Sequence, residues 1–485
     1  MLFNSLTYLL FLPVTLAAFL LAPARWRWAV LLLASYGYYA ALGSDALLYL
    51  GAVTLVVWLA AQGISRSSDP RIRASWLAAG LAVVLGALFA FKFYDFLAGE
   101  VERLAALSVP VLPRLGLKAP AGFSFYAFAA ASYLIDSHAR HVDPQPHPGH
   151  TAFYLAYFPK LLAGPIERAT TLLPKLQAGL AVDPALLVPG LQLIVWGLFK
   201  KVVIADNLAP LVDRSFAIAA YASPMELLLA VYFFAFQIYC DFSGYTDIAI
   251  GTSLLFDIRL MENFRRPYFS KSTAEFWGSR WHISLSRWFR DYLYIPLGGS
   301  RRGELRRYAA IMTVFVVSGL WHAGLGYGVS WGFIVWGALN GLYQWAGMAT
   351  RNFWRAVGGR WPRLAASIPV HLFRVLLTFH LIAIAWVFFR AKSVADALTI
   401  LQKIANSAAQ LPGLVARYPF STGQYWGMGL IAFLVIIEIA DERRPVFERL
   451  AALPTGLRWG AYYAGIFALL LIGRWQGQQF IYMQF

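Results

Sequence analysis

Residues 276–322 read FWGSRWHISLSRWFRDYLYIPLGGSRRGELRRYAAIMTVFVVSGLWH, a basic and aromatic segment followed by an apolar run that ends on His322. The basic part carries seven arginines against only two acids, Asp291 and Glu304. These arginines are Arg280, Arg287, Arg290, Arg301, Arg302, Arg306 and Arg307. Such a density of positive charge next to an apolar run indicates a segment at a membrane surface.

The first half of this segment has helical periodicity. At about 100° per residue, five apolar side chains fall within roughly 40° of one line. They are Trp277, Trp281, Leu285, Trp288 and Tyr292. The pattern predicts a helix that lies in or dips into the membrane surface, with arginines free to reach phosphates. The alternative is an ordinary juxtamembrane helix whose arginines contact only lipid headgroups. Pro296, Gly298 and Gly299 are predicted to end the helix.

His322 lies between two apolar runs, because the sequence becomes apolar again after Gly326. An ionisable side chain between membrane segments is costly unless it lines a cavity or has a partner, so His322 is predicted to be functional. A histidine that only hydrogen-bonds neighbouring helices is the alternative.

The composition indicates a polytopic membrane protein. Of 485 residues, 59% are hydrophobic and only 13% are charged, about half the charged fraction of a soluble chain. The formal net charge of +17 is typical of cytoplasmic loops, so nucleic acid is a poor explanation for it. A single cysteine, Cys240, excludes an intramolecular disulfide and is expected to pack within a helix.

Apolar runs of spanning length predict about eleven transmembrane helices, with no strands because open sheets are not stable in lipid. The runs cover residues 2–22, 26–42, 45–62, 74–98, 186–209, 224–256, 306–321, 327–349, 368–389, 424–440 and 456–473. Two further runs, 119–136 and 151–165, are shorter or interrupted by charge and Pro-Gly pairs. They are expected to be re-entrant, entering the membrane and returning. The first run has no basic flank or cleavage site, so it is expected to remain as a membrane helix.

The charges of the early loops predict an N-terminus outside the cytoplasm. Arginines follow the first and third runs, at positions 25, 27, 66, 71 and 73, and none follows the second. Positive loops stay in the cytoplasm. The arginine-rich residues 259–307 are expected on the cytoplasmic side for the same reason.

Two other groups of ionisable residues are candidate sites. Asp241 and Asp247 lie within one long apolar run, where they must pair or face water, and arginines of the basic segment are their expected partners. Four histidines occupy a proline-containing loop at positions 138, 141, 147 and 150. Their spacing matches no zinc motif, so a solvated loop is expected and no metal site is assigned.

Several motifs together resemble the membrane-bound O-acyltransferase family, in the bacterial branch that acetylates alginate, peptidoglycan or cellulose. The matching motifs are FPKLLAGPIER (158–168), DFSGYTDIAIG (241–251), NFRRPYFSKSTAEFWGSRWHISLSRWFRDYLYIPLGG (263–299), SGLWH (318–322) and QFIYMQF (479–485). The resemblance covers most of the chain after Ala119, whereas residues 1–118 match only in hydrophobic character.

The resemblance implies a single helical acyltransferase domain over residues 1–485, built around a central tunnel. Within it, residues 1–118 would form N-terminal helices, 119–350 the catalytic core and 351–485 C-terminal helices. The two family histidines correspond to His322 and His282, which are therefore the candidate catalytic residues. Arg280, Arg287 and Arg290 are the candidates for binding the phosphates of an acyl donor.

The implied reaction moves an acetyl group from a cytosolic thioester to hydroxyl groups of an extracytoplasmic polysaccharide, or to a partner acetyltransferase there. Acetyl-CoA is the expected donor, with no permanently bound cofactor, in the bacterial inner membrane. Buried histidine supplies a neutral base, or alternatively attacks the thioester itself. The alternatives are transfer of D-alanyl or another acyl group from a carrier protein to a cell-wall polymer, and a transporter or flippase with a His/Asp path. A scaffold that only anchors a modifying complex is a further alternative.

Overall fold

The computed structural model describes residues 1–105, 112–323, 331–475 and 480–481. All regular elements in these ranges are helical, and each of the eleven predicted apolar runs coincides with helix over its described residues. The predicted all-α class is therefore confirmed. Seven helical segments are long and apolar enough to cross a membrane: α3, α4, the continuous segment Pro184–Ala217, α12, α19, α22 and α24. The chain is a multi-pass membrane protein.

The described chain divides into two compact units. Unit 1 holds residues 1–197 and 245–261, and unit 2 holds residues 198–244 and 262–485. The long helix α12 (Pro224–Leu254) contributes its first part to unit 2 and its last part to unit 1.

Unit 1 is a bundle of the N-terminal helices. In it α3 and α4 pack against each other and against α6, while α2 packs against α7. The interrupted run 151–165 is divided as expected, because α7 ends before Tyr157 and the four-residue α8 follows it. The bounds are α1 Leu6–Leu21, α2 Arg27–Ala40, α3 Ser44–Arg66, α4 Pro70–Lys92, α5 Tyr94–Leu104, α6 Phe123–His138, α7 Pro148–Ala156, α8 Phe158–Leu161, α9 Ala169–Ala178 and α10 Pro184–Leu198.

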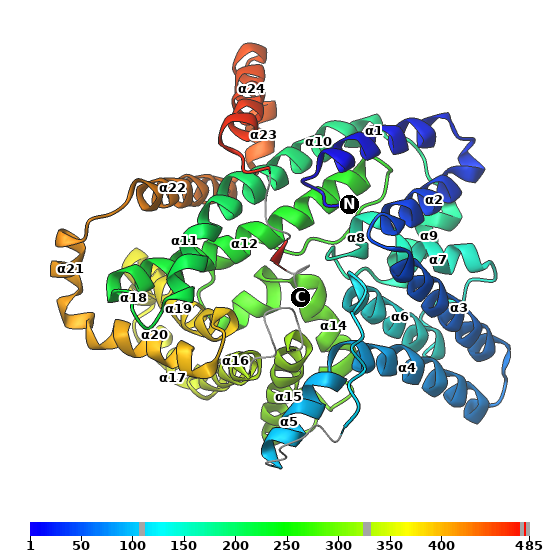
Figure 1. The fold of residues 1–485 in the computed structure, drawn as a ribbon, viewed down its shortest axis with the longest axis horizontal. Helices are drawn as coiled ribbons and strands as arrows, with labels where there is room; N and C mark the ends of the chain where they lie inside the picture. The colour runs from blue at the N-terminus through cyan, green and yellow to red at the C-terminus, as the bar shows by residue number, and fades with distance from the viewer. Residues whose placement is uncertain (106–111, 324–330, 476–479, 482–485) are drawn as a thin grey trace. The chain divides into compact units, whose positions relative to one another are not determined.

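Unit 2 contains the candidate site residues. Its main bundle packs α15 against α16 and α16 against α19 (Figure 1). The bounds are α11 Asp206–Ala217, α13 Thr273–Glu275, α14 Ile283–Phe289, α15 Glu304–His322, α16 Gly332–Ala349, α17 Arg351–Arg360, α18 Pro362–Ala365, α19 Ile368–Arg390, α20 Val394–Asn406, α21 Leu411–Arg417, α22 Thr422–Arg443, α23 Val446–Ala451 and α24 Thr455–Ile472.

Glycine allows α15 and α16 to approach closely. A Cβ atom on Gly319 would collide with the backbone carbonyl of Phe333, and one on Gly337 would collide with that of Phe315. Small residues at a helix contact let two backbones meet without intervening side chains, as is common in membrane proteins. This contact fixes the end of α15, which is His322, beside the first turns of α16.

Candidate functional site

The segment before α15 does not form the single striped helix that the sequence predicts. A π-helical turn covers Phe276–Arg280, the backbone is extended at Trp281, and His282 has φ +43°. Only then does α14 begin, so the aromatic residues do not share one face. Trp281 is instead buried in unit 2, where its ring contacts those of Phe276 and Trp386. The prediction was wrong because the left-handed residue changes the chain direction. The predicted end is confirmed, with positive φ at Gly298 and Gly299.

His282 is held by a side-chain network. Its Nδ1–H donates to the amide oxygen of Asn263 at 3.1 Å, and the same oxygen accepts from the backbone N–H and hydroxyl of Ser284. Since a backbone N–H can only donate, the Ser284 contact fixes which end of the Asn263 amide is oxygen. The neutral His282 ring therefore carries its proton on Nδ1 and keeps a lone pair on Nε2.

The backbone and surroundings of His282 are unusual for histidine. A non-glycine residue in the left-handed region is uncommon and costs free energy, and such residues cluster at functional sites. The ring is 98% buried, against Phe242 at 4.7 Å between ring centroids. His282 lies outside the seven candidate spans. Burial lowers the pKa of its imidazole well below 6.5, and the nearby His322 lowers that pKa further by a smaller amount. Its neutral form is thus favoured.

His322 is the last residue of α15 and is held by the helix backbone. Its Nδ1 lies 2.7 Å from the carbonyl oxygen of Ser318, one turn earlier. A carbonyl oxygen can only accept, so Nδ1 carries the proton and the neutral ring keeps a lone pair on Nε2. The two histidines reach the same tautomer through different partners.

Aromatic rings surround His322. Its ring centroid lies 4.5 Å from that of Trp321, 5.1 Å from Trp336 and 5.4 Å from Phe389. Phe333 stacks on it at 6.3 Å, and the histidine is 2% exposed. We call these four side chains the aromatic enclosure of His322. An apolar enclosure of this kind limits the access of water to the ring.

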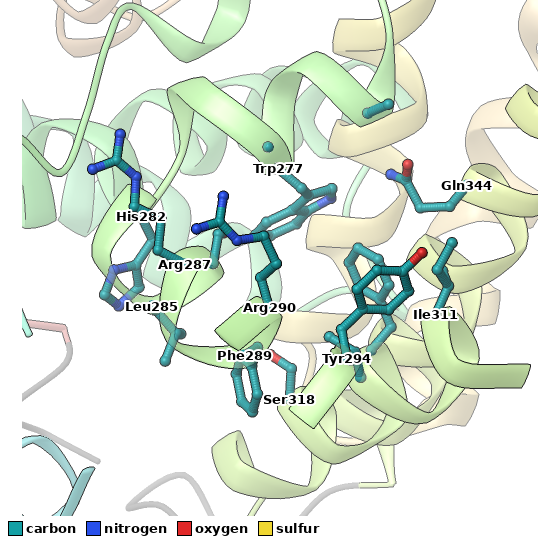
Figure 2. Close-up of a pocket in the computed structure, with 15 residues that line it drawn as sticks. Trp277, His282, Leu285, Arg287, Phe289, Arg290, Tyr294, Ile311, Ser318 and Gln344 are labelled. Carbon is teal, nitrogen blue, oxygen red and sulfur yellow. The ribbon is translucent and has the colours of Figure 1, made fainter. Parts of the chain in front are cut away.

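A pocket of about 280 Å³ in unit 2 brings several predicted residues together (Figure 2). His282, Arg287 and Arg290 line it, as do Trp277, Ser318 and Gln344. Figure 2 shows His282 and Arg287 at one side of the pocket and Gln344 at the other, with Arg290 between them. His322 is not among the lining residues, but it is one turn from Ser318 and close enough to His282 to influence it electrostatically.

The three candidate arginines have different positions. Arg287 and Arg290 are exposed at the pocket, where Arg290 also pairs with the neighbouring Asp291 at 2.8 Å. Arg280 is instead paired with Glu275 at 2.8 Å and with Glu442 at 3.1 Å, and is outside the pocket lining. The structure therefore groups two of the three arginines with His282 and gives the third a role in connecting this segment to the end of α22.

Sequence reasoning missed Asn263, which holds His282. Asn263 is completely buried, although exposed Glu262 precedes it and exposed Arg265 lies two residues after it. Its position at the start of the longest quoted motif is the only signal for it.

The partner of Asp241 was also predicted wrongly. Asp241 pairs with Lys201 at 2.6 Å, not with an arginine of the basic segment, and Lys201 also contacts Asp206 at 2.9 Å. The backbone N–H of Ile481 donates to the other oxygen of Asp241. A pair of lysines within an apolar run, at 200 and 201, was the available signal. Cys240 is buried in α12, as predicted.

The described residues contain no group of three or more His, Cys, Asp or Glu side chains arranged to hold a metal ion. In the histidine-containing loop, His147 and His150 both contact the ring of Trp28. His150 faces the side-chain oxygen of Gln145 at 3.3 Å, and His147 accepts from the N–H of Gly149. These contacts use the imidazole nitrogens for local hydrogen bonds.

The chain matches the model of the membrane-bound O-acyltransferase family over residues 136–387, about half of its length. This range includes His282, His322 and the candidate arginines. A probable alginate O-acetylase of Azotobacter vinelandii is 36% identical over 402 residues, which cover 81% of this chain and 76% of the relative.

Two other relatives have different named activities. The peptidoglycan O-acetyltransferase of Helicobacter pylori is 33% identical over 408 residues, covering 79% of this chain and 73% of the relative. The teichoic acid D-alanyltransferase of Bacillus subtilis is more distant, at 24% identity over 280 residues, covering 56% of this chain and 68% of the relative.

Proposed function

We propose, from the premise that this chain belongs to the membrane-bound O-acyltransferase family and is an O-acetyltransferase, that it acetylates an extracytoplasmic polysaccharide. The acetyl group would pass from a cytosolic thioester to hydroxyl groups of the polymer, or to a partner acetyltransferase outside the cytoplasm. The observation that carries the proposal is the convergence of His282, Arg287 and Arg290 on one pocket, with His322 in electrostatic reach.

His322 is the proposed base. Its Nε2 lone pair would accept the proton of the attacking hydroxyl, and the imidazolium would return that proton to the leaving thiolate. In the second possible route, Nε2 attacks the thioester carbonyl, releases the thiol and forms an acyl-imidazole that the alcohol then cleaves. Both routes need the tautomer that the Ser318 carbonyl imposes. The aromatic enclosure would keep water from hydrolysing the acetyl donor.

His282 and the two pocket arginines would act on the donor side. Arg287 and Arg290 present guanidinium groups suited to the phosphates of acetyl-CoA, and the lining beneath them includes apolar side chains that suit the thioester arm. His282 would then accept a hydrogen bond through Nε2 from a group near the thioester. Acetyl-CoA would be a substrate, and the proposal includes no permanently bound cofactor.

The proposed location is the bacterial inner membrane, with the N-terminus in the periplasm and the arginine-rich pocket facing the cytosol. The distribution of basic loops supports this orientation. The partners would be the thioester donor, the acceptor polysaccharide, an extracytoplasmic acetyltransferase and membrane lipid, with no role for nucleic acid.

Transfer of a D-alanyl group from a carrier protein is a second candidate, supported by the more distant D-alanyltransferase relatives. A transporter or flippase that uses buried His and Asp residues has no support from the relatives reported above. Feeding membranes with labelled acetyl-CoA or labelled D-alanyl carrier protein distinguishes these reactions, since each would label the polymer with a different group.

Replacing His322 with alanine tests the proposal. We expect polymer acetylation to fall by about 10²–10⁴-fold at an unchanged protein level. His380→Ala is a matched control, because His380 also donates from Nδ1 to the carbonyl four residues earlier, at 2.7 Å, but is exposed on α19. Full acetylation by the His322→Ala enzyme would exclude the catalytic assignment, as would equal losses in both variants.

A further inference from the structure

The connection between α16 and α19 is a short basic and aromatic segment, formed by α17 and α18. It contains four arginines and no acidic residue between Thr350 and Ser367. The arginines are Arg351, Arg355, Arg360 and Arg363. Both flanking helices are apolar, and α19 is long enough to cross a membrane. The segment therefore leads directly into a helix, α19, that is long and apolar enough to cross the bilayer.

Helix α17 has one apolar face. At about 100° per residue, Phe353, Trp354 and Val357 fall within about 100° of one another, Arg355 lies on the opposite face, and Arg351 and Arg360 lie at the two edges of the apolar face. Phe353 is 62% exposed and Trp354 is 60% exposed, so the rest of the described chain does not cover the apolar face. An exposed apolar face with arginines opposite it and at its edges is the pattern of a helix lying in a membrane interface.

The residues after α17 extend the same surface. Trp361 and Leu364 are both more than half exposed, and the guanidinium of Arg360 lies 5.8 Å from the centroid of the Trp361 ring. Tryptophan is enriched at the level of lipid headgroups, where its ring is apolar and its N–H meets water. Arginine binds phosphate through a planar, bidentate fork.

The segment lies at the arginine-rich end of unit 2. The indole N–H of Trp345, near the end of α16, donates to the carbonyl of Tyr308, near the start of α15, at 2.8 Å. The start of α15 directly follows Arg301 and Arg302. The α17–α18 segment therefore begins at the same membrane face as the basic segment.

We propose that α17–α18 is a binding site for anionic phospholipid headgroups, with its aromatic face inserted among the lipids and its four arginines on the phosphates. The attachment to α19 decides between lipid and a soluble partner. An uncovered apolar face at the start of a membrane-spanning helix lies near the level where acyl chains begin, and the charge of the segment complements an anionic leaflet.

The site is tested with the full-length protein in nanodiscs of phosphatidylcholine, with or without phosphatidylglycerol. Native mass spectrometry should show phosphatidylglycerol retained in preference to phosphatidylcholine, by about tenfold, and the variant R351Q/R355Q should lose this preference. The matched control is R443Q/R444Q, which removes two exposed arginines that have acids beside them, Glu442 and Glu448. Equal retention by R351Q/R355Q and the wild type would overturn the proposal.

A photo-crosslinking residue in place of Trp354 identifies what covers the apolar face. An adduct with phospholipid is expected in native membranes, and an adduct mainly with another protein would overturn the lipid assignment. The catalytically disabled His322→Ala protein should retain phosphatidylglycerol normally. The lipid site and the proposed acetyl transfer can therefore fail independently of each other.

Discussion

The surroundings of His282 and His322 differ in what holds each ring. A buried side-chain network centred on Asn263 holds His282, on a left-handed backbone at the start of α14. His322 is held by the carbonyl of Ser318 within a regular helix, and by the aromatic enclosure. Both arrangements leave the lone pair on Nε2. The tautomer of His282 thus depends on a side chain, Asn263, that a single substitution removes. The tautomer of His322 depends on a backbone carbonyl, which remains when the Ser318 side chain is replaced.

The two regions also differ in access. His282, Arg287 and Arg290 line the pocket, whereas aromatic rings pack around His322, which is 2% exposed. The charged side chains beside His282, Arg287 and Arg290, are exposed, whereas the side chains packed against His322 are aromatic. The first region suits donor binding and the second suits a proton transfer or acyl transfer that water would disturb. The predictions below separate these roles.

The largest effect on stability is expected from opening the aromatic enclosure. Phe389→Ala removes a ring that contacts His322, Trp336 and Trp386 at 5.2–5.4 Å, and Phe389 is 4% exposed. Loss of a buried phenyl ring should cost about 4 kcal/mol of unfolding free energy. Thermal unfolding in detergent measures this loss. Because the Ser318 hydrogen bond remains, acetyl transfer should fall less than in His322→Ala, and an equal fall would contradict a backbone-held ring.

A somewhat smaller loss of stability is expected at the network of His282. Asn263→Leu leaves three buried donors, from His282 and Ser284, without their acceptor, which should cost about 3 kcal/mol. Ser318→Ala is the contrasting variant, since the carbonyl that holds His322 is unchanged, and it should cost under about 1 kcal/mol. Comparable losses in the two variants would show that the histidines are not held in different ways.

An aspartate at position 263 should change the pH dependence instead. Burial lowers the pKa of His282 well below 6.5, so the neutral ring persists into mildly acidic solution. A carboxylate beside Nδ1 favours the imidazolium form and raises that pKa. If neutral His282 is required, the acid limb of the acetylation rate of Asn263→Asp should move to higher pH by about one unit. An unchanged pH–rate profile would show that the charge of His282 does not limit the reaction.

The helices were predictable because their signals are local, and the two candidate histidines were also chosen on local signals. Each of the eleven apolar runs became helix over its described part, since length and hydropathy alone decide that outcome in lipid. His322 stood out as an ionisable residue between apolar runs, and the family motifs identified His282. A change in the direction of the chain has no comparable signal in the neighbouring residues. Helical periodicity continues through His282, yet one left-handed residue there redirects the chain.

Ion-pair partners were less predictable, because they depend on which helices meet. Asp241 was matched to arginines of the basic segment, but Lys201, on a different helical segment, lies beside it. A lysine within an apolar run costs free energy when it is buried without a partner, just as an aspartate does, so Lys201 was a candidate partner for Asp241. For the arginines, charge density indicated a basic surface without distinguishing Arg280, which pairs with Glu442, from those at the pocket.

The smallest effect is expected from single arginines of the pocket. Arg287→Gln or Arg290→Gln removes one charge that would contact donor phosphates, so KM for acetyl-CoA should rise about three- to tenfold while kcat changes little. Arg280→Gln is the control, because its ion pairs with Glu275 and Glu442 make it a connecting residue. That variant should lower the temperature of thermal unfolding without raising KM. Should Arg280→Gln raise KM as much as the pocket variants, donor binding would extend beyond the pocket, and the assignment of the donor to the His282 region would need to include the end of α22.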